Sequence, residues 1–258
     1  AILHVNPSNY RVVGFAEQVA LADLAALKKK YAVLLLDDLG CGALVNLEDY
    51  GLPHEPTAPE SIAAGADLCC FSADKLLGGP QAGIVVGRKD LLSIMRKHPL
   101  TRVLRVGKLT AMALEHTLRL FLDPQRLLAE HPTLRMIAAP AAPLRRAAQR
   151  LKRRIDKEEL PILAEVVPSE STTGGGALPA VPIPSYGLAV TVKGLSPDRL
   201  AGLLRNYEPP IIARIHDNRV LLDMRTLLAG DERTIAESLG HIACHSTRES
   251  PVQSKSPC

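Results

Sequence analysis

The stretch FSADKLLGGPQAGIVVG, residues 71–87, decides the fold of this chain. Lys75 follows a short apolar segment and is followed closely by Gly78-Gly79-Pro80, which is a turn signal. The apolar residues from Ala82 to Gly87 then predict a buried strand. We therefore expect Lys75 to lie on a tight turn between two hydrophobic elements.

A lysine on such a turn allows two interpretations. In apolar surroundings its ammonium group loses a proton easily and becomes a nucleophilic amine. That is the state needed to form a Schiff base with a carbonyl cofactor such as pyridoxal phosphate. Alternatively, Lys75 extends from the turn into water. The surrounding sequence is needed to choose between these two interpretations.

The composition indicates a globular protein. Of 258 residues, 47% are hydrophobic and 22% are charged, and a net charge of +4 does not by itself indicate nucleic-acid binding. With no bilayer-spanning apolar run and no signal-peptide pattern, we expect no membrane association and a cytoplasmic location. The adjacent Cys69 and Cys70 lie in an apolar run, which favours reduced core residues. Because Ala1, not Met, opens directly into a strand-like pattern, we expect the chain to be a fragment.

Strands and helices alternate in the first half of the chain. The second expected strand runs directly into Asp37-Asp38-Leu39-Gly40, and open α/β sheets bind ligands at the carboxyl ends of such buried strands. The alternation predicts a mostly parallel α/β sheet. Before Lys75 we expect strands at 1–5, 33–36 and 66–71 and helices at 15–30 and 60–66.

Three basic residues follow a helix expected at 90–96. On a single helix, the spacing of Arg102, Arg105 and Lys108 would place them on roughly one face, where they could meet an anion. A solvated helix face explains the same spacing equally well. A helix expected at 109–122 closes the first region.

The composition changes near Pro124. We interpret the arginines of a helix expected at 139–159 as a solvated face, with RNA contact as the alternative. Gly174-Gly175-Gly176, in a loop expected to begin at Ser169, lacks the strand-then-helix context of a phosphate loop. Strands at 186–192 and 219–223 and helices at 196–206 and 232–241 predict a small α+β domain, antiparallel with helices on one face. We expect part of a large domain at 1–123, the small domain at 124–245 and a disordered tail at 246–258.

Seven stretches of the sequence carry a family resemblance when they are taken in order. They are SNYRVVGF (8–15), DLGCGALVNL (38–47), GLPHEPT (51–57), AGADLCCFSADKLLGGPQAGIVVG (64–87), HPLTRVLRVGKLT (98–110), GGGALP (174–179) and EPPIIARI with RVLLDMRT (208–226). Together they resemble the bacterial L-seryl-tRNA(Sec) selenium transferases, or selenocysteine synthases, which are fold-type-I pyridoxal-phosphate enzymes. The resemblance covers nearly the whole chain apart from the tail. It implies the C-terminal part of a fold-type-I large domain with a mostly parallel sheet, followed by a small α+β domain.

The resemblance also implies a role for each matching residue. Lys75 is then the Schiff-base lysine, and Asp38 pairs with the pyridine nitrogen of the cofactor. Ser72 is expected to bind the cofactor phosphate, and Tyr10 and Asp74 to shape the pocket, Asp74 as part of the catalytic machinery. Arg102 and Arg105 are expected to hold the anionic selenium donor. For Arg214 and Arg225 we favour structural roles, and we predict no metal site.

The implied reaction converts seryl-tRNA(Sec) to selenocysteinyl-tRNA(Sec). Lys75 removes the α-proton of the serine, water leaves, and selenophosphate adds to the aminoacrylyl intermediate. In this family the active sites form between subunits of a ring of dimers, so the resemblance also implies a homo-oligomer.

Some features depart from the family pattern. Cys41 stands where serine is usual, Ala73 where glycine is usual and Gly107 where aspartate is common. The upstream phosphate-binding turn, the ring-stacking residue and the N-terminal tRNA-binding domain are not in this sequence. We therefore expect an N-terminally incomplete chain that is inactive alone.

Two other functions remain open. The chain could belong to a related pyridoxal-phosphate lyase acting on a small amino acid or an amino sugar phosphate, with Arg102 and Arg105 binding a substrate phosphate or carboxylate. It could also be a non-catalytic truncated product. Cofactor spectroscopy separates binders from non-binders, and activity toward seryl-tRNA separates the two enzymes.

Overall fold

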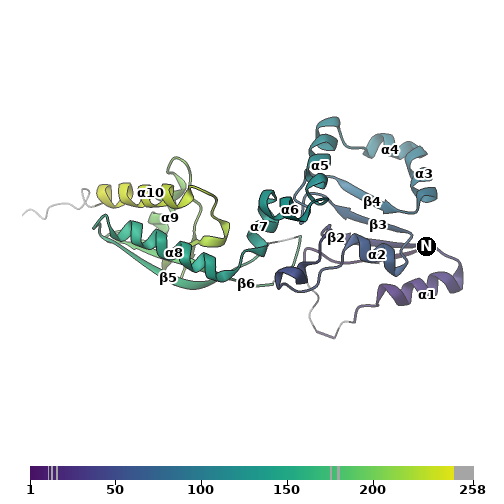
Figure 1. Cartoon of the computed structure of the whole chain (residues 1–258), viewed down its shortest axis with the longest axis horizontal. Coiled ribbons are helices and arrows are strands. Elements are labelled where there is room, and N and C mark those ends of the chain that lie inside the picture. Colours follow the sequence, from purple (N-terminus) through teal and green to yellow (C-terminus); the bar gives the residue numbers. More distant parts are fainter. Residues whose placement is uncertain (11, 13, 16, 175, 179–180, 247–258) are drawn as a thin grey trace, which may run out of the picture. The chain divides into compact units, whose positions relative to one another are not determined.

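The computed structural model describes residues 1–10, 12, 14–15, 17–174, 176–178 and 181–246 (Figure 1). The predicted tail from residue 247 on lies outside these ranges, as do positions 11, 13, 175 and 179 of the stretches quoted above. Contacts divide the chain into two units, and each is described by itself. The large unit comprises residues 1–138 with 172–181, and the small unit comprises residues 139–171 with the described residues from 182 on.

The large unit is an α/β layer. Its strands are β1 (Ile2–Val5), β2 (Leu35–Gly40), β3 (Leu68–Ser72) and β4 (Gly83–Gly87). Its helices are α1 (Leu21–Tyr31), the 3₁₀ turn η1 (Leu47–Tyr50), α2 (Ala58–Ala64), α3 (Lys89–Lys97), α4 (Pro99–Leu104), α5 (Lys108–Leu120), α6 (Pro124–Glu130) and α7 (Pro132–Ala138).

The large sheet has the strand order β1-β2-β3-β4. The first three strands are parallel, and β4 pairs antiparallel with β3. The carboxyl ends of β2 and β3 are therefore neighbours, with Asp38 opposite Cys70 and Gly40 opposite Phe71. The predicted mostly parallel α/β sheet is confirmed, and it places the residues after β2 beside the residues after β3.

A buried carboxylate ties α1 to this sheet. Asp67, just before β3, accepts hydrogen bonds from the Leu35 N–H at 2.9 Å and from Arg88 Nη1 at 3.0 Å. Lys28 Nζ of α1 lies 2.8 Å from the same carboxylate. Burial raises the pKa of Asp67, but the hydrogen bonds from Lys28, Leu35 and Arg88 outweigh burial and lower the pKa to about 2.

Two predicted helices begin elsewhere. The helix expected at 15–30 starts only at Leu21, after an extended Ala20. The helix expected at 60–66 starts at Ala58, because Thr57 and Glu60 form a capping box there. It ends at Ala64 and is capped by Gly65, whose φ of 109° is readily available only to glycine.

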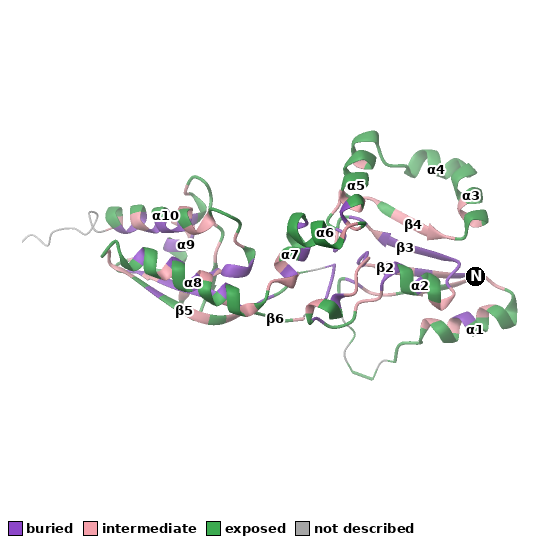
Figure 2. Ribbon diagram, viewed as in Figure 1, coloured by how far each residue is buried: buried purple, intermediate pink, exposed green. Residues whose placement is uncertain are grey.

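The prediction that Arg102, Arg105 and Lys108 share one face of a single helix is wrong. Arg102 lies on α4, which ends at Leu104, while Arg105 is extended and Lys108 begins α5. The helix breaks here because Arg105 and Gly107 both have extended backbone, with ψ of 141° and 169°. The described residues of α3 and α4 include none that is buried, and Figure 2 draws both helices mainly in the exposed colour, with part of α3 intermediate.

The small unit is an antiparallel sheet with helices. Its sheet has the order β5-β6-β8-β7, with antiparallel pairing throughout. The predicted antiparallel α+β arrangement is therefore present. Its elements are α8 (Ala141–Asp156), β5 (Ile162–Ser171), β6 (Ile183–Val192), α9 (Pro197–Arg205), β7 (Arg214–His216), β8 (Arg219–Asp223), the 3₁₀ turn η2 (Met224–Thr226) and α10 (Asp231–Ser246).

One face of this sheet carries the core of the small unit. The register pairs Val190 with Val220 and Leu188 with Leu222, and alternation puts these side chains on the same face. They form one cluster with buried residues of α8, α9 and α10, among them Leu151, Leu204 and Leu239. The prediction that residues 169–171 belong to a loop is wrong, because they continue β5 in register with β6.

Two arginines of the small unit make internal contacts. Arg225 is buried and donates to the carbonyl oxygens of Ala139 at 2.8 Å and Pro184 at 2.7 Å. Burial lowers the pKa of Arg225. Arg214 donates to Asp223 at 3.3 Å and to the Glu170 carbonyl at 3.1 Å. These contacts fit the structural roles favoured for both residues.

The grouping of contacts places α6 and α7 in the large unit. The domain boundary was expected after residue 123, whereas the first part of the large unit ends at Ala138. The reason is that α5 contacts α6 and α6 contacts α7. The segment 172–181, between β5 and β6, also belongs to the large unit. That segment bears directly on the lysine site.

Candidate functional site

The lysine turn is closed by backbone hydrogen bonds. Lys75 follows β3 by three residues, and its carbonyl accepts from the Gly78 N–H at 3.0 Å. Ala73 closes the turn from both sides, accepting from Gly79 at 2.8 Å and donating to Ala82 at 2.9 Å. The turn predicted between two hydrophobic strands is therefore present, and it fixes the direction in which Lys75 leaves the backbone.

His131 supports this turn from a distant part of the chain. Its ring is buried, Nδ1 accepts from the Leu134 N–H at 3.2 Å, and Nε2 lies 2.9 Å from the Leu77 carbonyl. Because Nδ1 accepts, the proton is on Nε2, which donates to Leu77. Gly78 has a φ of +70°, and a Cβ built there would lie 2.6 Å from the His131 ring. Glycine at this position lets the ring approach the turn.

The Lys75 side chain is half-buried and points to the segment after β1. Its Nζ donates a hydrogen bond of 2.7 Å to Oγ of Ser8, which is itself buried. The Ser8 carbonyl accepts from the Gly176 N–H at 3.1 Å. The amine of the predicted Schiff-base lysine is therefore held inside the large unit and does not extend freely into water.

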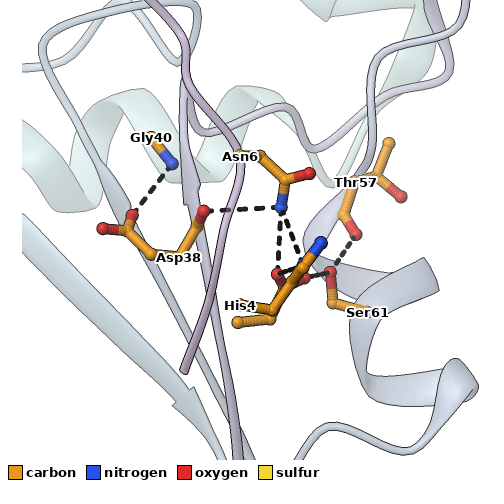
Figure 3. A network of polar contacts seen from close by, with 7 residues as sticks. His4, Asn6, Asp38, Gly40, Thr57 and Ser61 are labelled. Carbon is orange, nitrogen blue, oxygen red and sulfur yellow. Dashed lines mark hydrogen bonds and ion pairs between the residues drawn. The ribbon is translucent and has the colours of Figure 1, made fainter. Parts of the chain in front are cut away.

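The two consecutive aspartates of β2 occupy different surroundings. Asp37 is only 1% exposed, and its carboxylate accepts from Ser61 Oγ at 2.5 Å and from Asn6 Nδ2 at 2.9 Å, with His4 Nδ1 at 2.8 Å. Figure 3 shows His4, Asn6 and Ser61 gathered in this network. The hydrogen-bonding capacity of the Asp37 carboxylate is therefore committed to holding β1, β2 and α2 together.

Asp38 points to the other face of the sheet, because side chains alternate along a strand. It is half-buried, and its Oδ1 accepts from the Gly40 N–H at 3.0 Å (Figure 3). Burial, with the nearby carboxylates of Asp38 and Asp37, raises the pKa of the neighbouring Cys70 thiol. Of the two aspartates, Asp38 is the one with a carboxylate available to a ligand.

The loop after Asp38 lies against the lysine turn. The Leu76 N–H donates to the Cys41 carbonyl at 3.2 Å, and a Cβ built on Gly42 would lie 2.4 Å from the Ser72 carbonyl oxygen. Glycine is therefore required at 42, where its φ is +74°. Burial, with a smaller effect of Glu55, raises the pKa of the Cys41 thiol to about 12, so this cysteine is inert packing at neutral pH.

The remaining predicted pocket residues lie around this centre with different exposure. Ser72 is the half-buried last residue of β3, and Asp74 is exposed on the turn. Tyr10 is 63% exposed and lines a hollow of about 470 Å³ with His54 and Leu178, all within the large unit. The roles predicted for these three residues stay predictions.

The structure does not bring the two predicted arginines to Lys75. Because β4 runs antiparallel to β3, α3 starts beside the beginning of β3. Ser72 lies at the other end of β3. Figure 1 shows α4 next to α3. Arg102 and Arg105 are both exposed, and within the described ranges no hydrogen bond or ion pair joins them to Lys75, Asp38 or Ser72.

The chemical groups at this centre are those that pyridoxal phosphate needs. Lys75 offers an amine for a Schiff base, and Asp38 offers a carboxylate for a protonated ring nitrogen. Both come from the carboxyl ends of adjacent strands, joined by the contact between Leu76 and Cys41. Among the residues that the structure describes, no group of three or more His, Cys, Asp or Glu side chains could hold a metal ion.

Sequence reasoning missed three residues at this centre. Ser8 and Gly176 lie in two of the matching stretches without an assigned role, and His131 lies in none of them. The His131-Pro132 pair was a turn signal, but no local pattern shows that its ring contacts Leu77, 54 residues away. In the described part of the chain, no helix has the length and apolar character needed to span a membrane.

Comparison with known proteins gives a consistent picture. The family model for L-seryl-tRNA selenium transferase matches residues 1–228. The L-seryl-tRNA(Sec) selenium transferase of Caldanaerobacter subterraneus is 45% identical over 242 residues, covering 93% of this chain and 52% of that protein. The Geobacter metallireducens enzyme of the same name is 44% identical over 243 residues, covering 94% and 53%.

These relatives are longer than the chain, which spans about half their length. Among solved structures, a D-glucosaminate-6-phosphate ammonia-lyase matches with a TM-score of 0.53 and 20% identity, covering 95% of this chain and 57% of the lyase. This likeness concerns the fold alone. It agrees with the predicted fold class, an α/β sheet followed by a smaller α+β unit.

Proposed function

The chain belongs to the L-seryl-tRNA selenium transferase family, and from this membership we propose that it carries the lysine half of a pyridoxal-phosphate-dependent active site. The complete protein converts seryl-tRNA(Sec) to selenocysteinyl-tRNA(Sec) with selenophosphate as the selenium donor. Its partners are the charged tRNA and other copies of itself, and it works in the cytoplasm. The observation that carries this proposal is the Lys75 amine, held at 2.7 Å from Ser8 beside the carboxyl ends of β2 and β3.

Each residue of the centre has a distinct task. Lys75 would hold the cofactor through its amine, and Nζ would be the base that takes the α-proton of the serine. Asp38 would hold the ring nitrogen of the cofactor in its protonated form. Ser72 binds the phosphate, and Asp74 and Tyr10 line the pocket. Bound pyridoxal phosphate supplies an electron sink for the charge that develops at the serine Cα.

The hydrogen bond to Ser8 favours this use of Lys75. A hydroxyl oxygen accepts from the lysine amine but carries no charge, so it orients Nζ without the attraction that a carboxylate would exert on an ammonium group. The Asp37 network supports Asp38 indirectly. The Asn6 backbone N–H donates to the Asp38 carbonyl at 2.8 Å, and Asn6 Nδ2 donates to Asp37, so the end of β1 fixes the end of β2.

The arginines require a second copy of the chain. Arg102 and Arg105 are exposed on the α4 segment, away from the lysine turn in the fold described above. In the homo-oligomer, a ring of dimers, they serve the lysine of a neighbouring copy. There they hold selenophosphate through charge-assisted hydrogen bonds.

The proposal is tested by mixing the chain with pyridoxal phosphate, reducing with borohydride and mapping the labelled peptide. Label on Lys75 is the expected result, with visible absorbance before reduction. Lys89 is an exposed lysine of the same unit, and its replacement by alanine is a matched control that leaves the label in place. A label distributed over exposed lysines with Lys75 unmodified contradicts the proposed role.

A further inference from the structure

We propose that Ser8 and Gly176 are positioning residues that together fix the Lys75 side chain, Ser8 by holding its amine and Gly176 by packing on its stem. The inference deepens the proposed function, because Lys75 is the reacting lysine there. It concerns the lysine itself, however, and can be tested without cofactor.

The end of β2 confines the position of Ser8. It is 5% exposed, and a Cβ built on Gly40 would lie 2.7 Å from its Oγ and 3.0 Å from its Cβ. Gly40 has a φ of +65°, so this close approach between the end of β2 and Ser8 depends on glycine. The Oγ that accepts from Lys75 therefore has little room to move.

Gly176 contacts both partners. Its N–H donates to the Ser8 carbonyl at 3.1 Å. A Cβ built on Gly176 would lie 3.1 Å from Cγ and Cδ of Lys75, which is tighter than ordinary van der Waals contact. The Gly176 backbone therefore lies directly against the lysine stem, and any side chain at 176 must displace that stem.

The segment that carries Gly176 is anchored in the large unit. Ala177 and Leu178 are buried, and Gly176 itself donates to Ser8 of the large unit. Within the segment, the Ala177 carbonyl accepts from Thr173 Oγ1 at 2.5 Å. Gly176 is thus held against the large unit, while β5 and β6, which flank the segment, belong to the small unit. The triple-glycine stretch thus has a specific use at its last position.

A matched pair of glycines separates this role from general backbone strain. Gly174 and Gly176 both have positive φ, +77° and +101°, so alanine is strained at either position. A Cβ on Gly174 meets nothing within 4 Å, whereas a Cβ on Gly176 meets Lys75. Gly174→Ala therefore introduces backbone strain of the same kind as Gly176→Ala but no contact with the Lys75 side chain.

The experiment is competitive trace labelling of amines with acetic anhydride on the cofactor-free chain, followed by peptide mapping. The rate at Lys75 is divided by the rate at the exposed Lys89, which serves as an internal reference. We expect Gly176→Ala and Ser8→Ala each to raise this ratio about fivefold, as the loss of one hydrogen bond predicts. We expect Gly174→Ala to leave the ratio as in the unmodified chain.

Ser8→Ala keeps the test decisive if Gly176→Ala fails to fold, because it introduces no positive-φ strain. Equal ratios in the unmodified chain and Ser8→Ala overturn the inference, as do equal ratios in Gly174→Ala and Gly176→Ala. Cofactor capture is measured separately on the same samples. If the ratios change as expected but no chain captures pyridoxal phosphate, the positioning role stands and the proposed function fails.

Discussion

The ring of His131 donates a 2.9 Å hydrogen bond to the carbonyl of Leu77, two residues after Lys75 in the same turn. The same ring accepts from the Leu134 N–H and fills the space that the missing side chain of Gly78 leaves. The lysine turn is therefore supported by helices α6 and α7 as well as by its own sheet.

His131→Phe keeps the ring volume but removes both hydrogen bonds. We expect the free energy of unfolding to fall by about 3 kcal/mol, because a buried carbonyl and a buried N–H lose their partners. Urea unfolding followed by circular dichroism measures this loss. His116→Phe, on the exposed surface of α5, is the control and should change stability by less than about 0.5 kcal/mol. Equal midpoints for the two variants would show that the ring is not a support.

The neighbouring aspartates of β2 should respond differently to the same change. Asp37→Asn replaces one oxygen that accepts from a neighbour by a donor, so we expect a loss of about 2 kcal/mol of stability. Asp38→Asn should leave stability within about 0.5 kcal/mol but weaken the capture of pyridoxal phosphate. Urea unfolding and absorbance titration measure the two effects. The reverse pattern would mean that Asp37 faces the cofactor.

Asp67 gives the large unit a specific pH dependence. Its pKa is lowered on folding to about 2, so the folded state binds fewer protons at this site than the unfolded state. The stabilisation, on the order of 2 kcal/mol, is complete above the ordinary aspartate pKa and is lost as the pH falls from about 4 toward 2. Asp67→Asn should therefore lower stability at pH 7, and its difference from the unmodified chain should shrink below pH 4.

Urea midpoints of both chains between pH 7 and pH 3 test this. Asp49→Asn, at an exposed position of η1, should follow the unmodified chain at every pH. A difference for Asp67→Asn that is constant with pH would show that the ion pairs with Lys28 and Arg88 do not set the pKa of Asp67.

The arginines of α4 should matter for the selenium donor and not for the cofactor. Arg102→Ala and Arg105→Ala should leave the labelling of Lys75 by pyridoxal phosphate and borohydride unchanged. The same substitutions in the complete protein should impair selenium transfer. Each should weaken selenophosphate binding about tenfold, since each removes a charge-assisted hydrogen bond. Calorimetric titration measures the binding, and Arg96→Ala on α3 is the exposed control. Loss of Lys75 labelling in either variant would contradict this division of roles.

Sequence reasoning succeeded where the signal was local. The apolar runs around Lys75 and the consecutive aspartates gave the strands β2, β3 and β4 and the position of the turn between them. The choice of Asp38 over Asp37 came from family resemblance. Only the structure shows why the two differ: alternation along β2 sends Asp37 into the network with Ser61 and leaves Asp38 on the other face.

The failures have physical causes. No strand is expected from the sequence at β5, where Ser169 is assigned to a loop. Pro168 and Ser169 are typical of loops, yet ten cross-strand pairs hold β5 on β6. The basic residues after α3 were placed on one helix because their spacing is helical, but the extended backbone at Gly107 separates them. Contacts of Lys75 with Ser8 and Gly176 join segments far apart in sequence, and residue spacing carries no signal for such contacts.

The central claim is that Lys75 is the residue that captures pyridoxal phosphate, and one measurement tests it most directly. The chain and its Lys75→Ala variant are each mixed with pyridoxal phosphate, their visible spectra are recorded, and the adducts are reduced with borohydride and mapped. The account predicts a visible band and a label on Lys75 in the unmodified chain, and neither in the variant. An unchanged band in Lys75→Ala would contradict it.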